Sequence, residues 1–214
     1  MPPAAISRRR LVVLGLGAAV LLASGAARAE ADPAIVGPIK GLYDSLISVM
    51  KEGDKTPFAE RYDTLAPAID RALDLSAILQ FSVGPAAWNG LPADQQAALL
   101  DAFRRYTISL YVSSFNNFTG QKFTIEPDLR TVGADQIVMT KIIPASGDSH
   151  ELDYVMRQVG GDWKAVDVLS EGAISRVATQ RSDFRALLAH GGGPALLASL
   201  QQKTNDLSGG HATP

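Results

Sequence analysis

The sequence contains no cysteine and only three histidines in 214 residues. Without cysteine, the chain can form neither disulfide bonds nor a thiolate site for catalysis or metal binding. The histidines, His150, His190 and His211, lack the spacing and the accompanying carboxylates of a zinc or di-metal site. We therefore expect no metal centre and no cofactor.

Motifs of two common enzyme classes are also missing. The sequence has no Gly-x-Ser-x-Gly elbow, which would place a nucleophilic serine on a sharp turn. Gly191-Gly192-Gly193-Pro194 lacks the Lys-Ser or Lys-Thr of a phosphate-binding loop and is more typical of one helix ending and another beginning. The sequence thus predicts a protein that is not an enzyme.

The first 29 residues are typical of an export signal. Ser7-Arg8-Arg9-Arg10 precedes an apolar run from Leu11 to Ser24, and Ala27-Arg28-Ala29 has the small-x-small pattern of a cleavage site. We expect cleavage near Ala29, through either the twin-arginine or the Sec route. A retained membrane anchor is the alternative, although the apolar run is short for a transmembrane helix.

Without this segment the chain is acidic. Losing its four arginines leaves 16 basic against 22 acidic side chains, a net charge of −6. That charge disfavours nucleic acid and electrostatic docking on anionic lipid headgroups as partners. Residues 30–207 are enough for one domain with a sizeable core, which we expect to be monomeric, and residues 208–214 are predicted to form a disordered tail.

Helical patterns dominate both ends of this domain. Asp32-Pro33 is a favourable helix start, and Asp74 is placed to cap a short helix that Gly84-Pro85 ends. Pro67 is expected to kink or end the helix that starts near Pro57. Further helices are predicted over 92–118, 173–190 and 194–207. The apolar arc of the 92–118 helix is wide enough to contact apolar groups on two sides.

Between the helices, the apolar period becomes alternating. Four strands are predicted: Lys122–Glu126, Gln136–Ile143, Glu151–Val159 and Asp162–Leu169. Their short connections favour an antiparallel meander. The sequence therefore predicts an α+β fold, in which a four-stranded antiparallel sheet is flanked by N-terminal and C-terminal helices.

The last two strands form a hairpin around Gly160-Gly161, because paired glycines provide the positive φ angles of a two-residue turn. Pairing Val159 with Asp162 puts Tyr154 opposite Asp167. The bulkier hairpin face is assigned to the interior, and with an assumed register Ile137 and Met139 join it. This face contains Leu152, Tyr154, Met156, Trp163, Ala165 and Leu169.

Asp167 is the one polar group that this pairing places on the apolar face. A buried carboxylate needs partners or a proton. It is interpreted as a structural brace that binds backbone N–H groups or an arginine such as Arg176 or Arg181. The alternative is a general base in an isomerase-like or hydratase-like pocket.

Large aromatic and methionine side chains on these elements can form either a packed core or the wall of a ligand cavity. Periodicity alone does not separate these alternatives. As cavity-lining residues we expect Phe81, Trp88, Tyr106, Leu110, Phe115, Phe123, Ile125, Ile137, Met139, Tyr154, Met156, Trp163 and Phe184.

Several segments resemble the MlaC family of ABC transporter auxiliary components, also known as toluene-tolerance proteins. They are Leu152-Asp-Tyr-Val-Met-Arg157, Trp163-Lys-Ala-Val-Asp-Val-Leu-Ser-Glu-Gly172, Ile174-Ser175 and Gln180-Arg-Ser-Asp-Phe184. Other segments are most similar to the hopanoid-associated HpnM branch. These are Thr56-Pro-Phe-Ala-Glu-Arg-Tyr62, Phe103-Arg-Arg-Tyr106 and Ile142-Ile-Pro-Ala-Ser-Gly147.

The resemblance implies a periplasmic protein with a deep apolar cavity for a hopanoid or glycerophospholipid. It also implies a carrier between an inner-membrane ABC transporter complex and an outer-membrane acceptor. Two other functions stay open on the residues alone: a small-molecule isomerase or hydratase that uses Asp167, and a transporter adaptor that binds no lipid.

Overall fold

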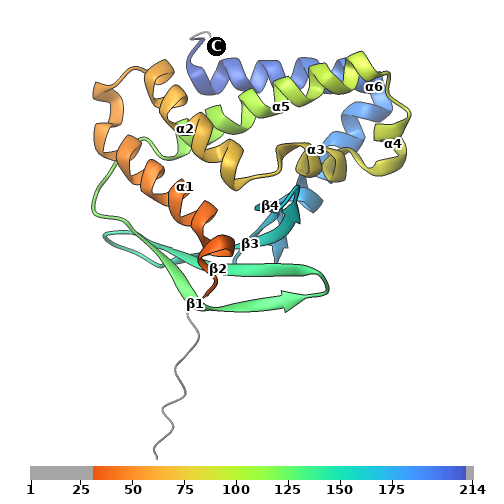
Figure 1. Ribbon diagram of the computed structural model, residues 1–214. Helices are drawn as coiled ribbons and strands as arrows, with labels where there is room; N and C mark the ends of the chain where they lie inside the picture. Colours follow the sequence, from red (N-terminus) through yellow and green to blue (C-terminus); the bar gives the residue numbers. More distant parts are fainter. Residues whose placement is uncertain (1–30, 211–214) are drawn as a thin grey trace, which may run out of the picture.

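Helices precede and follow a five-stranded antiparallel sheet in the computed structural model, which describes residues 31–210 (Figure 1). The α+β prediction is confirmed. The helices are α1 (Pro33–Glu52), the 3₁₀ helix η1 (Gly53–Lys55), α2 (Phe58–Ala72), α3 (Leu75–Val83), α4 (Pro85–Asn89), α5 (Ala93–Ser114) and α6 (Arg176–Ser208). The strands are β1 (Lys122–Val132), β2 (Asp135–Ile143), β3 (His150–Val159), β4 (Asp162–Ser170) and β5 (Ile174–Ser175).

The predicted helix caps are present. Asp32 accepts a hydrogen bond from the Ala34 N–H at 2.9 Å, and Asp74 accepts one from the Ala77 N–H at 2.9 Å. Each carboxylate satisfies a donor that the first turn of a helix leaves free. The predicted break in the last helix is also found, because Gly192 has non-helical angles of φ 64° and ψ −156° inside α6.

Pro67, which was expected to kink or end a helix, lies inside α2 and does not end it. This proline is exposed, so water can bind the carbonyl that loses its partner. Two helix boundaries were predicted wrongly. The long helix ends at Ser114 rather than near Phe118, since Phe115 leaves the helical region with ψ 62°. The last helix starts at Arg176 rather than Ala173, because Ile174 and Ser175 pair with β4.

That pairing makes the fifth strand, so the expectation of four was wrong. The sheet order is β1-β2-β3-β4-β5, and each strand is antiparallel to its neighbours. β1 also continues past Glu126, where the prediction ended it. A register shift between Ile125 and Leu129 accommodates Pro127, since proline cannot donate to a regular ladder and is tolerated at bulges and edges.

The β3–β4 hairpin contains a bulge that the sequence did not reveal. Gly160 and Gly161 both have positive φ, and Val159 pairs with Asp162 as predicted. Beyond the pair of Met156 with Ala165, however, Val155 pairs with Asp167, so β4 has one extra residue. Tyr154 therefore faces Val168 rather than Asp167.

A bulge of one residue exchanges the two faces of the strand beyond it. Val168 and Ser170 join Leu152 and Tyr154 on the face toward the helices, which we call the inner face. Asp167 and Leu169 turn to the outer face, so placing both on the apolar face was wrong.

The register assumed for β2 was also wrong by one residue. Val138 pairs with Tyr154, whereas Met139 pairs with Asp153 and Ile137 with Val155. Val138 and Thr140 consequently lie on the inner face, and Ile137 and Met139 lie on the outer face.

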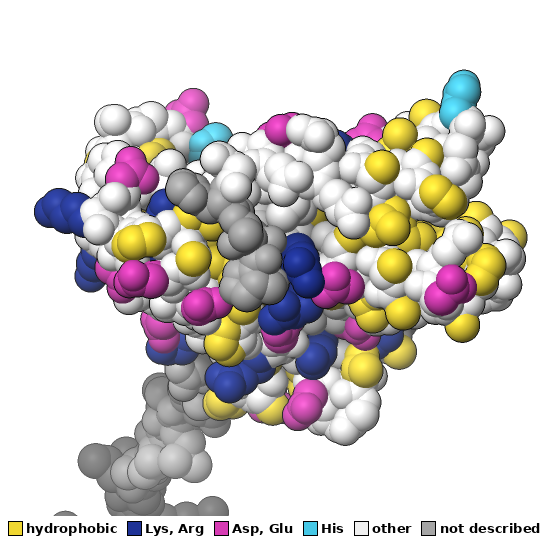
Figure 2. Space-filling view, turned by 90° about the horizontal axis from the view of Figure 1, so that it is seen from above, with side chains coloured by type: hydrophobic (Ala, Val, Ile, Leu, Met, Phe, Trp, Pro, Cys, Tyr) yellow, Lys and Arg dark blue, Asp and Glu magenta, His cyan; other side chains and the backbone are white. Residues whose placement is uncertain are grey.

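The core lies between the inner face and the helices. Tyr154 and Met156 on β3 are essentially inaccessible to solvent, as are Leu42 and Leu46 on α1. Figure 1 shows α1 descending onto the sheet, while α5 and α6 run together above it. Seen from above, the helical surface mixes charges of both signs with apolar side chains that gather near α4 (Figure 2).

None of the helices formed by residues 31–210 is long and apolar enough to span a bilayer. The predicted export signal lies outside the described residues, as do residues 211–214 of the predicted tail. Ser208, where that tail was expected to begin, is the last residue of α6.

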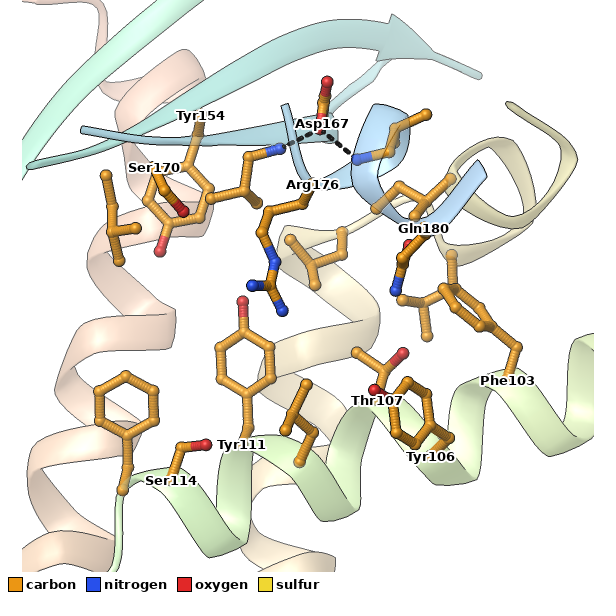
Figure 3. Close-up of a pocket in the computed structure, with 18 residues that line it drawn as sticks. Phe103, Tyr106, Thr107, Tyr111, Ser114, Tyr154, Asp167, Ser170, Arg176 and Gln180 are labelled. Carbon is orange, nitrogen blue, oxygen red and sulfur yellow. Dashed lines mark hydrogen bonds between the residues drawn. The ribbon is translucent and has the colours of Figure 1, made fainter. Parts of the chain in front are cut away.

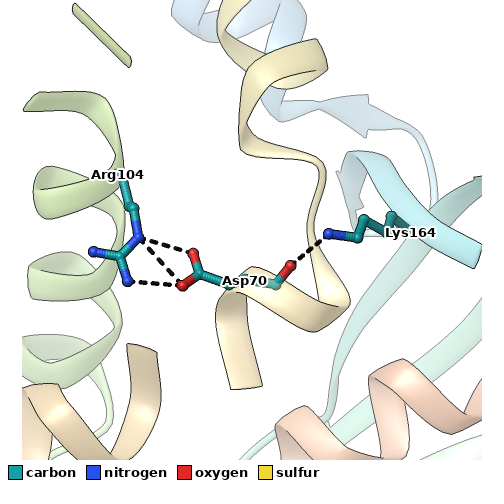
Figure 4. Close-up of polar contacts among 3 residues, drawn as sticks. All are labelled: Asp70, Arg104 and Lys164. Carbon is teal, nitrogen blue, oxygen red and sulfur yellow. Dashed lines mark hydrogen bonds and ion pairs between the residues drawn. The ribbon is translucent and has the colours of Figure 1, made fainter. Parts of the chain in front are cut away.

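Asp70, near the end of α2, connects the helical layer to the sheet (Figure 4). Its carboxylate accepts from Arg104 on α5 at 3.0 Å from Nε and 2.7 Å from Nη2. Its backbone carbonyl accepts from the Lys164 Nζ on β4 at 2.8 Å. A fork-shaped pair of this kind is the geometry in which a partly exposed ion pair contributes to stability.

Replacing Asp70 by Asn should lower the free energy of unfolding by about 1 kcal/mol, since one oxygen of the bidentate pair is lost. Urea denaturation followed by circular dichroism measures this change. The matched control is Asp44→Asn, because the Asp44–Lys40 pair is mostly exposed and its loss should change stability by less than about 0.5 kcal/mol. Equal effects of the two substitutions would contradict the role of Asp70.

Candidate functional site

A pocket of about 290 Å³ lies between the inner face of the sheet and the helices (Figure 3). This volume is close to the lower end of the range of about 300–1,000 Å³ for ligand sites. Helices α3, α5 and α6, strands β3 and β4, and the α2–α3 junction contribute to its wall. The lining residues are Leu73, Leu75, Ile78, Phe103, Tyr106, Thr107, Leu110, Tyr111, Ser114, Phe115, Leu152, Tyr154, Asp167, Val168, Ser170, Arg176, Val177 and Gln180.

Helix α5 forms one wall of the pocket. Phe103, Thr107, Leu110 and Ser114 follow one another at steps of three or four residues, so they share one side of the helix. Ile108 and Val112 lie on the opposite side of α5, where they are inaccessible to solvent and packed in the core. The helix therefore has two buried sides, one in the core and one that lines the pocket.

The opposite wall is the part of the inner face that the bulge creates. Leu152 and Tyr154 come from β3, and Val168 and Ser170 lie opposite them on β4. With a regular hairpin, the charged side chain of Asp167 would replace that of Val168 and the larger side chain of Leu169 would replace that of Ser170. The bulge thus keeps a carboxylate from pointing into the apolar wall.

Tyr154 is held by a chain of buried hydroxyl groups. Its hydroxyl is hydrogen-bonded to that of Tyr43, which donates to the Thr140 Oγ1 at 2.5 Å, and Thr140 in turn donates to the Leu152 carbonyl. Burial raises the pKa of Tyr154 well above its usual value and that of Tyr111 to about 12. Both tyrosines are therefore neutral at physiological pH.

The junction of β4 and α6 is fixed by Asp167. Its carboxylate accepts from the backbone N–H groups of Val168 at 2.7 Å and Val177 at 3.1 Å, and from the Ser175 Oγ at 2.5 Å. In Figure 3 this carboxylate points away from the pocket. These contacts match the brace interpretation, with backbone N–H groups and a hydroxyl rather than an arginine as its partners.

Two polar side chains from the start of α6, those of Arg176 and Gln180, extend toward α5 (Figure 3). Gln180 accepts from the Ser82 Oγ at 3.1 Å. Arg176 is exposed and lies on the same side of the pocket as Ser170. The pocket is therefore apolar through most of its wall and has a polar, cationic edge.

Four of the residues expected to line a cavity do line this pocket: Tyr106, Leu110, Phe115 and Tyr154. Four others are buried elsewhere: Trp88, Met156 and Phe184 in the main core, and Ile137 on the outer face. Phe81, Phe123, Ile125 and Trp163 are partly buried and pack against the core. Met139 borders a shallow outer groove instead.

Some of these side chains support the pocket from behind. Phe184 meets Phe103 edge to face, with ring centroids 6.4 Å apart, and Phe123 contacts Phe115 at 6.0 Å. Thr107, Tyr111 and Ser114 were not among the predicted site residues, although their three- and four-residue spacing along α5 could have indicated them. Arg176 was considered only as a possible partner of Asp167, and neither it nor Gln180 belongs to an apolar stripe that would have placed it in the site.

Comparisons with known proteins agree with this architecture. The family model described as "MlaC protein" matches residues 40–202. No curated protein sequence matches the chain. A solved structure of a phospholipid-binding protein from Ralstonia solanacearum, in complex with a phospholipid, has a TM-score of 0.69 and 20% identity. The match covers 80% of this chain and 97% of that one.

The hydroxyl chain predicts unequal effects of two chemically identical substitutions. Tyr43→Phe leaves the buried Tyr154 hydroxyl without its acceptor and should lower the free energy of unfolding by about 2 kcal/mol. Tyr154→Phe removes only the terminal donor and should cost less than about 1 kcal/mol. Urea denaturation of both variants measures the difference in the free energy of unfolding. A larger loss of stability for Tyr154→Phe would contradict the assignment of Tyr154 as the first donor of the chain and Tyr43 as its acceptor.

Proposed function

The chain belongs to the MlaC family, and from that membership and its pocket we propose that it binds a lipid and carries it across the cell envelope. One observation supports this proposal above the others: the pocket is apolar along α5 and the inner face and polar at the edge near Arg176. That division corresponds to the two ends of an amphiphile. The fold shared with a phospholipid-binding protein is consistent with the proposal.

A carrier of this kind needs no chemical step. Each buried CH₂ group is worth about 0.8 kcal/mol, so a long-chain or polycyclic lipid crosses water very slowly without help. A protein that encloses the apolar part removes most of this barrier. The neutral tyrosines and apolar side chains of the pocket are suited to holding hydrocarbon.

Family membership and the expected export signal support a proposal for the compartment and the partners. We place the protein in the periplasm, where it exchanges lipid with an inner-membrane ABC transporter complex and an outer-membrane acceptor. The blocks Thr56–Tyr62, Phe103–Tyr106 and Ile142–Gly147 favour the hopanoid-associated branch of the family, so a hopanoid and a glycerophospholipid are both candidate cargoes.

An enzymatic function has less support. Asp167 was the candidate general base, but its carboxylate is turned from the pocket and accepts three hydrogen bonds. A base must lie within reach of the proton that it removes. A binding protein is therefore the better interpretation of this site.

Protein purified under gentle conditions from its own cell envelope should carry lipid. Native mass spectrometry is expected to show an added mass that extraction identifies as an amphiphile with a long or polycyclic apolar part. Exclusively lipid-free protein under these conditions would contradict the proposal.

Filling the pocket should remove the lipid. Leu110→Trp places a larger side chain on the pocket wall, where the indole would occupy space that the lipid needs. The lipid-bound fraction should fall by at least about tenfold, because adding volume to a filled space forces its neighbours apart. The control is Leu207→Trp, which makes the same change near the end of α6, outside the pocket lining. Unchanged lipid content in Leu110→Trp, with the protein folded, would show that the lipid lies elsewhere.

A further inference from the structure

Arg176 places a positive charge in the lining of the pocket, and an apolar ligand would have no use for this charge. It is the first residue of α6, and Figure 3 shows its side chain extending from the sheet side toward α5. Other arginines have structural partners: Arg104 binds Asp70 and Arg157 binds Asp135, each through two nitrogens. Within residues 31–210, the guanidinium of Arg176 makes no hydrogen bond or ion pair.

The nearest acidic group in the pocket lining does not neutralise this cation. Asp167 is occupied by Val168, Val177 and the Ser175 hydroxyl, and no ion pair joins it to Arg176. The early backbone donors of α6 are also in use, because the Val177 N–H binds Asp167 and the Ala178 N–H binds the Ser175 Oγ. An anion at this place would therefore be held by the Arg176 side chain rather than by the helix terminus.

The electrostatic surroundings locate the charge beside the pocket. Burial raises the pKa values of Tyr106 and Tyr111, and the positive charge of Arg176 acts against this rise at both residues. Both tyrosines line the pocket from α5, while Arg176 reaches it from α6. Lys203 and Asp183 also act on Tyr106 but do not line the pocket. Among the residues that do line it, Arg176 is the one cation, and the other polar groups are neutral or already bound.

We propose that Arg176 binds the phosphate of the lipid headgroup while the tail lies against α5 and the inner face, a role that rests on the proposed lipid-binding function. A guanidinium presents its N–H groups in a planar fork that matches two phosphate oxygens. This arrangement selects amphiphiles that carry a phosphate over neutral lipids with the same apolar part. Arg176 is accordingly a specificity-determining residue.

The test compares two single-chain probes with the same tail, dodecyl phosphate and 1-dodecanol, in equilibrium dialysis below their aggregation limits. The unmodified chain should bind dodecyl phosphate about tenfold more tightly than dodecanol, because a charge-assisted hydrogen bond is gained. Arg176→Gln should weaken dodecyl phosphate binding about tenfold and leave dodecanol binding unchanged. Arg176→Lys should restore part of the difference, since lysine keeps the charge without the fork.

Arg185→Gln is the matched control, because Arg185 lies on α6 outside the pocket lining and its loss should leave both affinities unchanged. Equal affinities of the unmodified chain for the two probes would overturn the role of Arg176, although lipid binding itself would stand. Failure of both probes to bind would overturn the proposed function as well. If inorganic phosphate bound as tightly as dodecyl phosphate, the ligand of Arg176 would be free phosphate rather than a lipid headgroup. That result would also overturn the proposal.

Discussion

The pocket depends on one extra residue in β4. The bulge between the Met156–Ala165 and Val155–Asp167 pairs reverses the faces of the strand beyond it. Val168 consequently joins Tyr154 on the wall, and the carboxylate of Asp167 becomes free to bind the start of α6. A regular ladder would instead direct that carboxylate into an apolar space, where an unpaired charge is costly. The same local irregularity thus provides both the apolar wall and the anchor of the helix that carries Arg176.

Local sequence signals predicted the parts of the fold that depend on neighbouring residues. Asp32 and Asp74 cap helices by accepting from N–H groups that are two or three residues further along the chain. The sequence around each aspartate is therefore enough to predict the cap. Gly160-Gly161 forms the turn because both residues need positive φ. The wide apolar arc of α5 likewise depends only on helical spacing, and this arc forms one wall of the pocket. These signals predicted the α+β class and four of the residues that line the pocket.

The remaining features depend on contacts between distant segments. Nothing in the alternation of β4 marks Val166 as the extra residue, so Asp167 and Leu169 were assigned to the wrong face. The register of β2 was assumed, and an error of one residue moved Ile137 and Met139 to the inner face in place of Val138 and Thr140. Periodicity also cannot separate a wall from a packed core, which is why Met156 and Phe184 were expected to line the cavity although they fill the core.

We propose that the apolar part of a lipid lies between α5 and the inner face of the sheet. Nuclear Overhauser contacts between a dodecyl phosphate tail and methyl-labelled side chains measure this location directly. Contacts of the tail with Leu110, Leu152 and Val168, together with none to Met139 on the outer face, are the expected result. Tail contacts confined to Met139 and its neighbours on the outer face would contradict the claim.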